Sequence, residues 1–301
     1  MKKALIIGFG SIGKRHAHVL SYMGCLVAIV SQQINVSYKR YPRITDALST
    51  HFDYIIIANA TYLHEQSLFE ILRSSFSGPI LVEKPLFSQP HQFECDNANS
   101  VFVGYNLRFH PVLQYLKKIL QGEEIISFHV RVGQYLPTWR PQIDYRNSCS
   151  AKKDEGGGVL RDLSHELDYA TWICGDCISV AAIGGKLSAL EIDSDDTYSI
   201  LMKCQWVPVV MIHMDYLSRI KKREIIVQTK RNTIVADLIQ NRVSINEVEE
   251  KFESVDTYMQ QHIAILSQNF QQLCSYSQGL KIIKLIDLIE QANLKKEWML
   301  I

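Results

Sequence analysis

The sequence of 301 residues lacks long apolar runs and lacks an excess of charge of either sign. No stretch reaches the length of a membrane span, and the apolar part of the opening segment MKKALIIGFG is too short for a signal peptide and breaks at glycine. Because the net charge is only +1, no overall field draws the chain to nucleic acid or to an anionic membrane. We therefore expect a protein that binds neither nucleic acid nor membranes.

Cysteine is present, but without the spacing of a metal site or a disulfide framework. The seven cysteines are an odd number and lie far apart, which predicts reduced thiols and a cytoplasmic location. Cys174 and Cys177 form a lone C-x-x-C with no second pair and no histidine at ligand spacing, so we expect no metal. Repeats and low-complexity tracts are also missing. Apolar residues at 47% and charged residues at 21% predict a globular chain of one or two domains.

A glycine-rich motif stands at the start of the chain. The apolar run Lys3–Ile7 predicts a buried strand, and Gly8, Gly10 and Gly13 then form G-x-G-x-x-G ahead of a helix that runs to about Tyr22. In this context the glycines allow a tight turn, a close approach to a pyrophosphate and the packing of the helix on the strand. Because a helix N-terminus attracts phosphate, the motif predicts dinucleotide binding.

The second predicted strand, Cys25–Val30, ends in Ser31-Gln32-Gln33 and not in the Asp or Glu that holds the ribose hydroxyls of NAD. Loss of that carboxylate removes its repulsion of a 2′-phosphate. Four nearby cations are either partners for such a phosphate or solvated surface: Lys14, Arg15, Lys39 and Arg40. The sequence thus predicts NAD or NADP and does not decide between them.

Strands and helices alternate up to about residue 120, which predicts a doubly wound parallel sheet with its ligand crevice at the carboxyl ends of the strands. Asn59 and His64 follow the strand Tyr54–Ala58 and are either ligand contacts or caps and packing residues. Glu83-Lys84-Pro85 follows the strand Ile80–Val82. A desolvated lysine can polarise or protonate a substrate oxygen, although a Glu–Lys pair on a loop is the simpler interpretation. Pro85 would stiffen this turn, with a cis bond as one option.

The pattern changes after residue 121. Ile125–Gly133 reads as a strand, and several later strand-like runs with few helices between them predict a mostly antiparallel sheet. Two helices, about Thr257–Cys274 and Gly279–Asn293, are expected to close the chain. A long loop, residues 134–155, carries aromatic and cationic side chains suited to a polar or anionic ligand, unless the aromatics serve to pin the loop itself. These side chains are Tyr135, Trp139, Arg140, Asp144, Tyr145, Arg146 and Lys152.

The segment GGGVLRDLSHELD, residues 156–168, predicts a helix with two distinct faces. One face is an apolar core stripe made of Leu160, Leu163, Leu167, Ala170 and Cys174. The other face carries Asp162, His165, Tyr169 and Trp172. We interpret His165 as a proton-transfer group with Asp162 one turn away to orient it, and the three glycines as room for nicotinamide and substrate. An ordinary helix packed on both sides is the alternative.

Taken in order, GFGSIG, ANATYLH, EKP, GYNLRFHP and the segment GGGVLRDLSHELD resemble the Gfo/Idh/MocA oxidoreductases, the family of glucose–fructose oxidoreductase and inositol dehydrogenase. The resemblance implies an N-terminal Rossmann domain, placed at residues 1–120. It also implies a C-terminal α/β domain, placed at residues 121–301, with a mostly antiparallel open sheet that often forms the oligomer interface. By this resemblance Lys84, Asp162 and His165 are the catalytic residues. The family commonly spaces the Asp and His four apart, whereas here they are three apart, which weakens the case for Asp162 as a direct partner.

We therefore expect a cytoplasmic, homodimeric or homotetrameric NAD(P)-dependent oxidoreductase that acts on a hydroxyl or keto carbon of a sugar, nucleotide sugar or cyclitol. The loop QYLPTWRPQIDYRNSCSA resembles a branch tied to surface-polysaccharide or nucleotide-sugar metabolism. The alternatives are a redox-neutral sugar lyase or hydrolase with tightly bound NAD, and a non-catalytic cofactor- or sugar-sensing regulator. Expected cofactor contacts are Gly8, Gly10, Ser11, Ile12, Gly13, Ser31, Asn59, Ala60, His64, Glu83, Lys84 and Asn106. Expected substrate contacts are Arg108, Tyr135, Trp139, Arg140, Tyr145 and Arg146.

Overall fold

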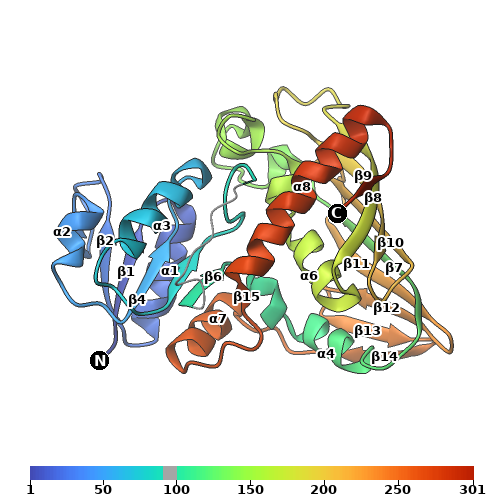
Figure 1. The fold of residues 1–301 in the computed structure, drawn as a ribbon, viewed down its shortest axis with the longest axis horizontal. Helices are drawn as coiled ribbons and strands as arrows, with labels where there is room; N and C mark the ends of the chain where they lie inside the picture. Colours follow the sequence, from blue (N-terminus) through green and yellow to red (C-terminus); the bar gives the residue numbers. More distant parts are fainter. Residues whose placement is uncertain (91–99) are drawn as a thin grey trace. The chain divides into compact units, whose positions relative to one another are not determined.

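The computed structural model describes residues 1–90 and 100–301, which form two compact units (Figure 1). The first unit combines Met1–Asn106 with Asp256–Ile283, and the second combines Leu107–Val255 with Lys284–Ile301. The expected division into residues 1–120 and 121–301 stays a prediction beside this grouping. No helix among the described residues is both long enough and apolar enough to span a bilayer.

The core of the first unit is a seven-stranded sheet in the order β15-β6-β5-β4-β1-β2-β3. Its strands are β1 Lys3–Ile7, β2 Leu26–Val30, β3 Lys39–Tyr41, β4 Tyr54–Ile57, β5 Ile80–Val82, β6 Val101–Val103 and β15 Cys274–Ser275. All the described neighbours pair in parallel except β15, which runs antiparallel to β6. The central strand β4 is buried at every residue, as a parallel sheet covered on both faces requires. The predicted doubly wound sheet is confirmed.

Helices of the first unit connect or cover these strands. They are α1 Ser11–Tyr22, α2 Ile44–Leu48, α3 His64–Leu72, α7 Thr257–Leu266 and the beginning of α8 Tyr276–Lys295. The predicted helix over Thr257–Cys274 is too long. It ends at Leu266 because Gln268 adopts a positive φ of 59°, and Cys274 then lies in β15.

The second unit is built on a nine-stranded sheet in the order β14-β13-β12-β11-β7-β10-β9-β8-β16. Its strands are β7 Ile125–Gly133, β8 Cys177–Gly185, β9 Thr197–Cys204, β10 Val209–Asp215, β11 Lys222–Thr229, β12 Thr233–Asp237, β13 Arg242–Ile245, β14 Val248–Lys251 and β16 Met299–Leu300. The pair β7–β10 is parallel, and the other described pairs are antiparallel. The predicted mostly antiparallel sheet is therefore confirmed, although the short strands β3, β14, β15 and β16 were not predicted.

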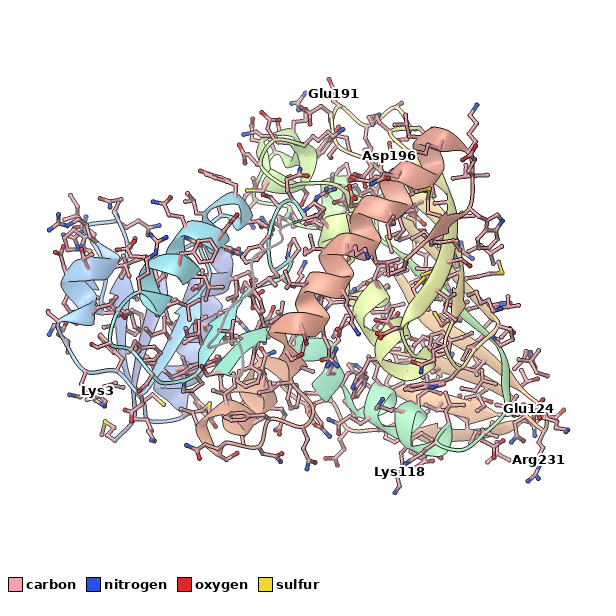
Figure 2. The ribbon with its side chains drawn as sticks, viewed as in Figure 1. Lys3, Lys118, Glu124, Glu191, Asp196 and Arg231 are labelled. Carbon is pink, nitrogen blue, oxygen red and sulfur yellow. The ribbon has the colours of Figure 1, made fainter. Side chains whose placement is uncertain are left out.

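One face of the larger sheet is covered by helices (Figure 1). Helix α4 Pro111–Ile119 packs on β12 and β13, while α5 Val159–Asp162 and α6 His165–Cys174 pack on β10 and its neighbours. Burial along β9 alternates residue by residue, so every second side chain faces the helices and the others face away. Figure 2 shows Glu191 and Asp196 at one end of this unit and Glu124 and Arg231 at the other.

Candidate functional site

The glycine motif of the first unit separates into two glycines demanded by packing and one that leaves open space. Gly8 has a φ of +95°, and a Cβ there would lie 2.5 Å from the backbone nitrogen of Asn59. A Cβ on Gly13 would lie 2.1 Å from the carbonyl oxygen of Gly8. A Cβ on Gly10, by contrast, meets no described atom within 4 Å. The chain therefore keeps a free approach to its backbone at Gly10, as a bound pyrophosphate requires.

Gly10 is also the extended N-cap residue of α1, and no described side chain caps this helix end. The first N–H groups of a helix have no partner within the helix, and they carry partial positive charge. Ser11 is exposed and Ile12 half-buried at this end. The N-terminus of α1 thus fits a phosphate group.

The carboxyl ends of the neighbouring strands are level with this helix end. Ile7 pairs with Ile57, Ile57 with Val82, and Val82 with Val103, so the residues that follow β1, β4, β5 and β6 leave the sheet at one edge. That edge carries expected contacts after each strand: Gly8, Asn59, Ala60, Glu83, Lys84 and Asn106.

Asn59 combines a satisfied and an unsatisfied polar group. Its Nδ2 donates to Ser67 Oγ at 2.9 Å, while its buried Oδ1 has no hydrogen-bond partner among the described residues. Buried acceptors without partners are rare in proteins and point to a group that binds there. Together with the open space at Gly10, Asn59 Oδ1 fits a polar cofactor at this edge. Ala60, the next residue, is exposed.

His64 joins two loops of this edge and does not reach the surface. Its side chain is 1% exposed, with Nε2 3.2 Å from the carbonyl oxygen of Asn59 and Nδ1 3.1 Å from that of Pro85. Burial lowers the pKa of His64, so the ring is neutral at pH 7. This geometry favours the packing alternative for His64 over the expected cofactor contact.

The Glu83-Lys84-Pro85 turn is held by its own carboxylate. Glu83 is 6% exposed; its Oε1 lies 2.9 Å from His16 Nε2 and its Oε2 accepts the backbone N–H of Lys84 at 3.3 Å. The Lys84–Pro85 bond is cis, as the sequence allowed. Asn106, the last residue of this part of the unit, is buried and donates from Nδ2 to Thr257 Oγ1 at 2.6 Å.

The end of β2 is lined by amides, a hydroxyl and cations. Ser31 Oγ accepts from the Gln33 N–H at 3.1 Å, and its carbonyl accepts from Arg40 Nη1 at 3.0 Å. Arg15 is occupied by Asp256 at 3.0 Å. Of the four cations, Lys14, Lys39 and Arg40 therefore remain candidates for a 2′-phosphate, and NAD versus NADP stays open.

In the second unit, the expected continuous helix around Asp162 and His165 is two helices. Helix α5 ends at Asp162 and α6 begins at His165, with Leu163 at a φ of −99° and ψ of 25° between them. Each helix is tied to a different element, because Arg161 binds Glu290 of α8 at 2.7 Å while Glu166 binds Arg223 of β11 at 2.8 Å. Asp162 and His165 thus flank a break and do not share a face of one helix. The apolar stripe, in contrast, is buried as predicted.

Two further residues that the sequence did not single out position this break. Tyr216 donates its hydroxyl to Asp162 Oδ2 at 2.6 Å. Asp195 caps α5, accepting the N–H of Leu160 on Oδ2 at 3.0 Å, and its burial raises its pKa to about 6. A Cβ on Gly158 would lie 2.2 Å from Asp195 Oδ1.

The glycine run was predicted to leave room for ligands, and the surroundings of Gly157 and Gly158 do not favour this prediction. Gly158 serves the Asp195 cap, and a Cβ on Gly157 would lie 2.1 Å from the carbonyl oxygen of Cys149. The space beside both glycines is therefore filled by the protein itself. Tyr169, expected on the site face, is fully buried beside Glu166, with its hydroxyl 3.4 Å from Glu166 Oε1.

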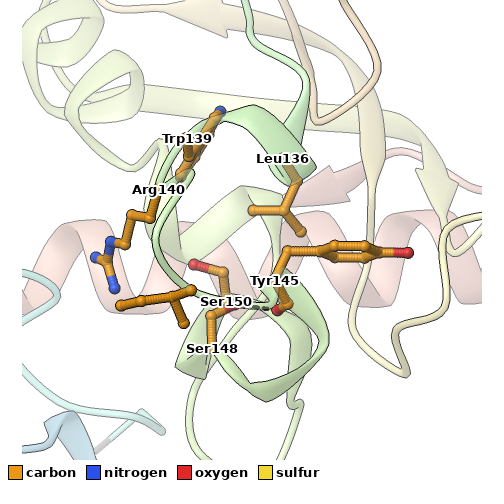
Figure 3. A pocket seen from close by; sticks show the side chains of 7 residues that line it. Leu136, Trp139, Arg140, Tyr145, Ser148 and Ser150 are labelled. Atoms are coloured by element: carbon orange, nitrogen blue, oxygen red, sulfur yellow. Dashed lines mark hydrogen bonds between the residues drawn. The ribbon is translucent and has the colours of Figure 1, made fainter.

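The loop 134–155 is largely pinned by its own side chains. Trp139 donates from Nε1 to the carbonyl of Gln134 at 3.1 Å, and its ring meets Tyr216 edge-on with centroids 5.2 Å apart. The Arg219 guanidinium lies 3.4 Å from the ring centroid of Tyr135. Figure 3 shows Trp139, Arg140 and Tyr145 around a small hollow of about 10 Å³. That volume holds no more than one water molecule, so the hollow itself is not a sugar pocket.

Three arginines expected to bind substrate differ in their partners. Arg146 is held by both oxygens of Asp144 and by Glu191 at 3.1 Å. Arg108 is 2% exposed and forks onto Asp168, at 2.7 Å for the closest pair, which favours a structural role. Arg140 is exposed and makes no ion pair with the described residues. Among the three, Arg140 is the one available to an anionic ligand.

Comparison with known proteins finds one family model that matches part of the second unit. Residues 114–235 match the GFO/IDH/MocA C-terminal domain. In sequence the chain is similar to the uncharacterized oxidoreductase YrbE of Bacillus subtilis, with 27% identity over 220 residues, or 64% of this chain. The chain spans 60% of the length of that relative.

Solved structures share the fold over the whole chain. The WlbA dehydrogenase of Bordetella pertussis, determined with NADH and UDP-GlcNAcA, has a TM-score of 0.81 at 18% identity, covering 100% of this chain and 97% of the other. Levoglucosan dehydrogenase, determined with NADH and levoglucosan, has a TM-score of 0.83 at 15% identity, covering 100% and 99%. At these identities the likeness establishes the fold.

Proposed function

We propose that the chain is a member of the Gfo/Idh/MocA family and an NAD(P)-dependent oxidoreductase acting on a hydroxyl or keto carbon of a sugar, nucleotide sugar or cyclitol. The observation that carries the proposal is the shared sheet edge of the first unit. There the open backbone at Gly10, the unsatisfied Asn59 Oδ1 and the Glu83–Lys84 turn follow neighbouring strands.

In this proposal Gly10, Ser11, Ile12 and Gly13 bind the pyrophosphate through the N-terminus of α1, and Ser31 borders the adenosine ribose. Asn59 contributes its amide oxygen as an acceptor. A nicotinamide dinucleotide bound there supplies a hydride acceptor or donor. Lys84 holds its ammonium toward the reacting oxygen and stabilises the alkoxide that develops there.

His165 is the proposed general base that takes the hydroxyl proton during oxidation and returns it during reduction. Asp162, fixed by Tyr216, supports the His165 segment as a positioning group. Of the expected substrate contacts, the exposed Arg140 is the proposed anion-binding residue, while Tyr135, Trp139 and Tyr145 shape the loop around it.

We also propose that the chain forms a homo-oligomer through its larger sheet. The face of the larger sheet that carries no helices exposes Ile183, Leu201 and Met211, at 76%, 38% and 46%, beside Trp298 at 53%. An exposed apolar patch of this kind is typical of a protein–protein interface, and we place a homodimer or homotetramer contact there. Light scattering should find an oligomer in the wild type and a monomer in Leu201→Asp.

We further propose a cytoplasmic location and a role in surface-polysaccharide or nucleotide-sugar metabolism. The six described cysteines are free thiols, which fits the reducing conditions of the cytoplasm.

The decisive experiment compares Lys84→Met with the control Lys2→Met, which removes an exposed lysine that pairs with Asp53. A panel of nucleotide sugars and free sugars is screened with NAD and NADP by absorbance at 340 nm. We expect Lys84→Met to lose at least about a hundredfold in kcat while its dinucleotide affinity stays within about threefold, because removal of one group that stabilises a developing oxyanion costs factors of this size. The Lys2→Met variant should match the wild type.

Undiminished turnover in Lys84→Met would contradict the catalytic assignment. A dinucleotide that copurifies with the protein, together with product formation and no net change at 340 nm, would instead establish the redox-neutral alternative.

A further inference from the structure

Four buried polar side chains of the first unit form a continuous line of hydrogen bonds. Tyr54 Oη lies 3.2 Å from His262 Nδ1, His262 Nε2 lies 3.0 Å from His16 Nδ1, and His16 Nε2 lies 2.9 Å from Glu83 Oε1. The four residues come from β4, α7, α1 and the turn after β5. Tyr54, His16 and His262 are fully buried, and Glu83 is 6% exposed.

The chemistry of these groups allows only one donor-to-acceptor direction for this line of hydrogen bonds. The described residues offer the Tyr54 hydroxyl no partner other than His262, so its buried O–H is satisfied only if it donates to His262 Nδ1. His262 must then carry its proton on Nε2 and donate to His16 Nδ1. His16 in turn carries its proton on Nε2 and donates to the Glu83 carboxylate. Every proton therefore points toward Glu83.

Burial supports a neutral His262 in this line. Desolvation lowers the pKa of His262 well below its ordinary range. A neutral imidazole has one donor and one acceptor, which is what each position in the line requires. Leucine at either position would avoid the cost of burying a polar ring, so the line has a role other than filling the core.

The end of the line is the residue that holds Lys84. Glu83 Oε1 receives His16, and Glu83 Oε2 receives the backbone N–H of Lys84 at 3.3 Å. The carboxylate also fits closely against Gly104, where a Cβ would lie 2.7 Å from Oε1. The Glu83 carboxylate is thus confined by His16, by Gly104 and by the turn that presents Lys84.

We propose that Tyr54, His262 and His16 form a directional hydrogen-bond relay that positions the Glu83 carboxylate and, through it, the backbone of Lys84. His16 and His262 are then positioning residues for Lys84, because the relay reaches Lys84 through Glu83. This inference rests on the proposed function, since the catalytic value of the relay depends on the role of Lys84. The direction of the relay does not depend on it.

The first test reads the protonated nitrogen of each ring by NMR of protein labelled with ¹⁵N-histidine, with signals assigned from His16→Gln and His262→Gln. At pH 7 both rings should carry the proton on Nε2, with Nδ1 unprotonated. A proton on Nδ1 of either ring, or an imidazolium, would overturn the relay. This experiment needs neither cofactor nor substrate, so it separates failure of the relay from failure of the proposed function.

The second test uses a volume-conserving pair of variants. Tyr54→Phe removes the donor to His262 Nδ1, so His262 should lose its single tautomer in the same spectra. The control Tyr41→Phe removes a hydroxyl bonded to Thr50 at 2.9 Å, in the same unit but outside the relay, and should leave both histidine spectra unchanged. An unchanged His262 spectrum in Tyr54→Phe would count against the relay.

The third test reads Lys84 through kinetics with the sugar that the screen identifies. His262→Leu should lower kcat about tenfold with KM for the sugar within about twofold, since small displacements of a catalytic group cost rate. His262→Gln keeps a donor toward His16 and should recover most of that loss. A lower melting temperature with unchanged kcat in His262→Leu would reduce the relay to a packing role and overturn the proposal. If His262→Leu does not fold, Tyr54→Phe replaces it, with kcat reduced about threefold. An unchanged kcat in Tyr54→Phe would then overturn the proposal.

Discussion

The glycine loop of the first unit and the loop 134–155 of the second unit are both candidate ligand loops, and they are built in opposite ways. At Gly8, Gly10 and Gly13 the arrangement is set by the backbone, and one position is left open. In the loop 134–155 the arrangement is set by contacts within the loop, such as Arg146 with Asp144 and Trp139 with the carbonyl of Gln134. The first loop is thus ready for a ligand, whereas the second is filled by its own residues.

This difference shows which glycines and arginines indicate a ligand-binding site. A glycine that packing requires and a glycine that a ligand requires look alike in the sequence, but only the second has empty space beside it. An arginine in a loop likewise indicates a ligand only when no carboxylate of the protein takes it. Gly10 and Arg140 pass these criteria, while Gly13 and Arg146 do not.

The largest expected effect separates Gly13 from Gly10. Gly13→Ala forces a Cβ to within 2.1 Å of the Gly8 carbonyl oxygen, so both the melting temperature and dinucleotide affinity should fall, the affinity by about a hundredfold or more. Gly10→Ala places its Cβ in open space, so the melting temperature should hold while affinity falls at least about tenfold. Thermal melts and titration with NADH and NADPH check both. Unchanged affinity in Gly10→Ala would mean that the open space serves no pyrophosphate.

A stability effect is expected in the second unit at His110, the N-cap residue of α4. Burial lowers the pKa of His110 to about 4, below its ordinary value near 6.5. At a pH between these two pKa values, His110 is protonated in the unfolded chain but not in the folded chain. The free energy of unfolding should therefore fall as the pH drops from about 6.5 to about 4. The loss should be on the order of 2 kcal/mol.

Urea denaturation of wild type and His110→Gln at pH 7, 5.5 and 4.5 measures this contribution as a difference. Burial raises the pKa of Asp195 to about 6, so protonation of Asp195 stabilises the folded chain as the pH falls, opposite to the effect of His110. The pH dependence of wild-type stability alone therefore does not isolate the contribution of His110. The variant should lose less stability on acidification than the wild type. Parallel curves for the two proteins would show that folded His110 titrates normally.

A smaller effect distinguishes the two loop arginines. Arg140→Ala should raise KM for an anionic nucleotide sugar about tenfold, since a charge-assisted contact is lost. Arg146→Ala should change KM less than about twofold, because Arg146 is engaged by Asp144 and Glu191. Steady-state kinetics with the identified substrate decides, and equal effects of the two substitutions would remove the distinction drawn between them.

The smallest expected effect concerns Asp162. Tyr216→Phe removes the hydroxyl that donates to Asp162 Oδ2 at 2.6 Å, and we expect kcat to fall about threefold with KM unchanged, because one positioning hydrogen bond is lost. Asp162→Asn keeps an acceptor for Tyr216 and serves as its partner in a double-mutant comparison. Additive losses would show that the two residues act independently.

The sequence predicted the fold because its signals are local. Strand bounds at Ile80–Val82 and Ile125–Gly133 follow from short apolar or alternating runs, and the glycine motif follows from its place between strand and helix. The break between Asp162 and His165 could not be predicted, because it depends on Glu290 and Arg223, which are distant in sequence. The histidine partner of Glu83 was hidden for the same reason, since His16 is 67 residues away in the sequence.

The central claim is that the first unit binds a nicotinamide dinucleotide at the open backbone of Gly10. Calorimetric titration of the wild-type protein with NADH and with NADPH, alongside Gly10→Ala, tests it most directly. We expect saturable binding of one dinucleotide per chain and at least about tenfold weaker binding by Gly10→Ala. No binding of either dinucleotide by the folded wild-type protein would contradict it.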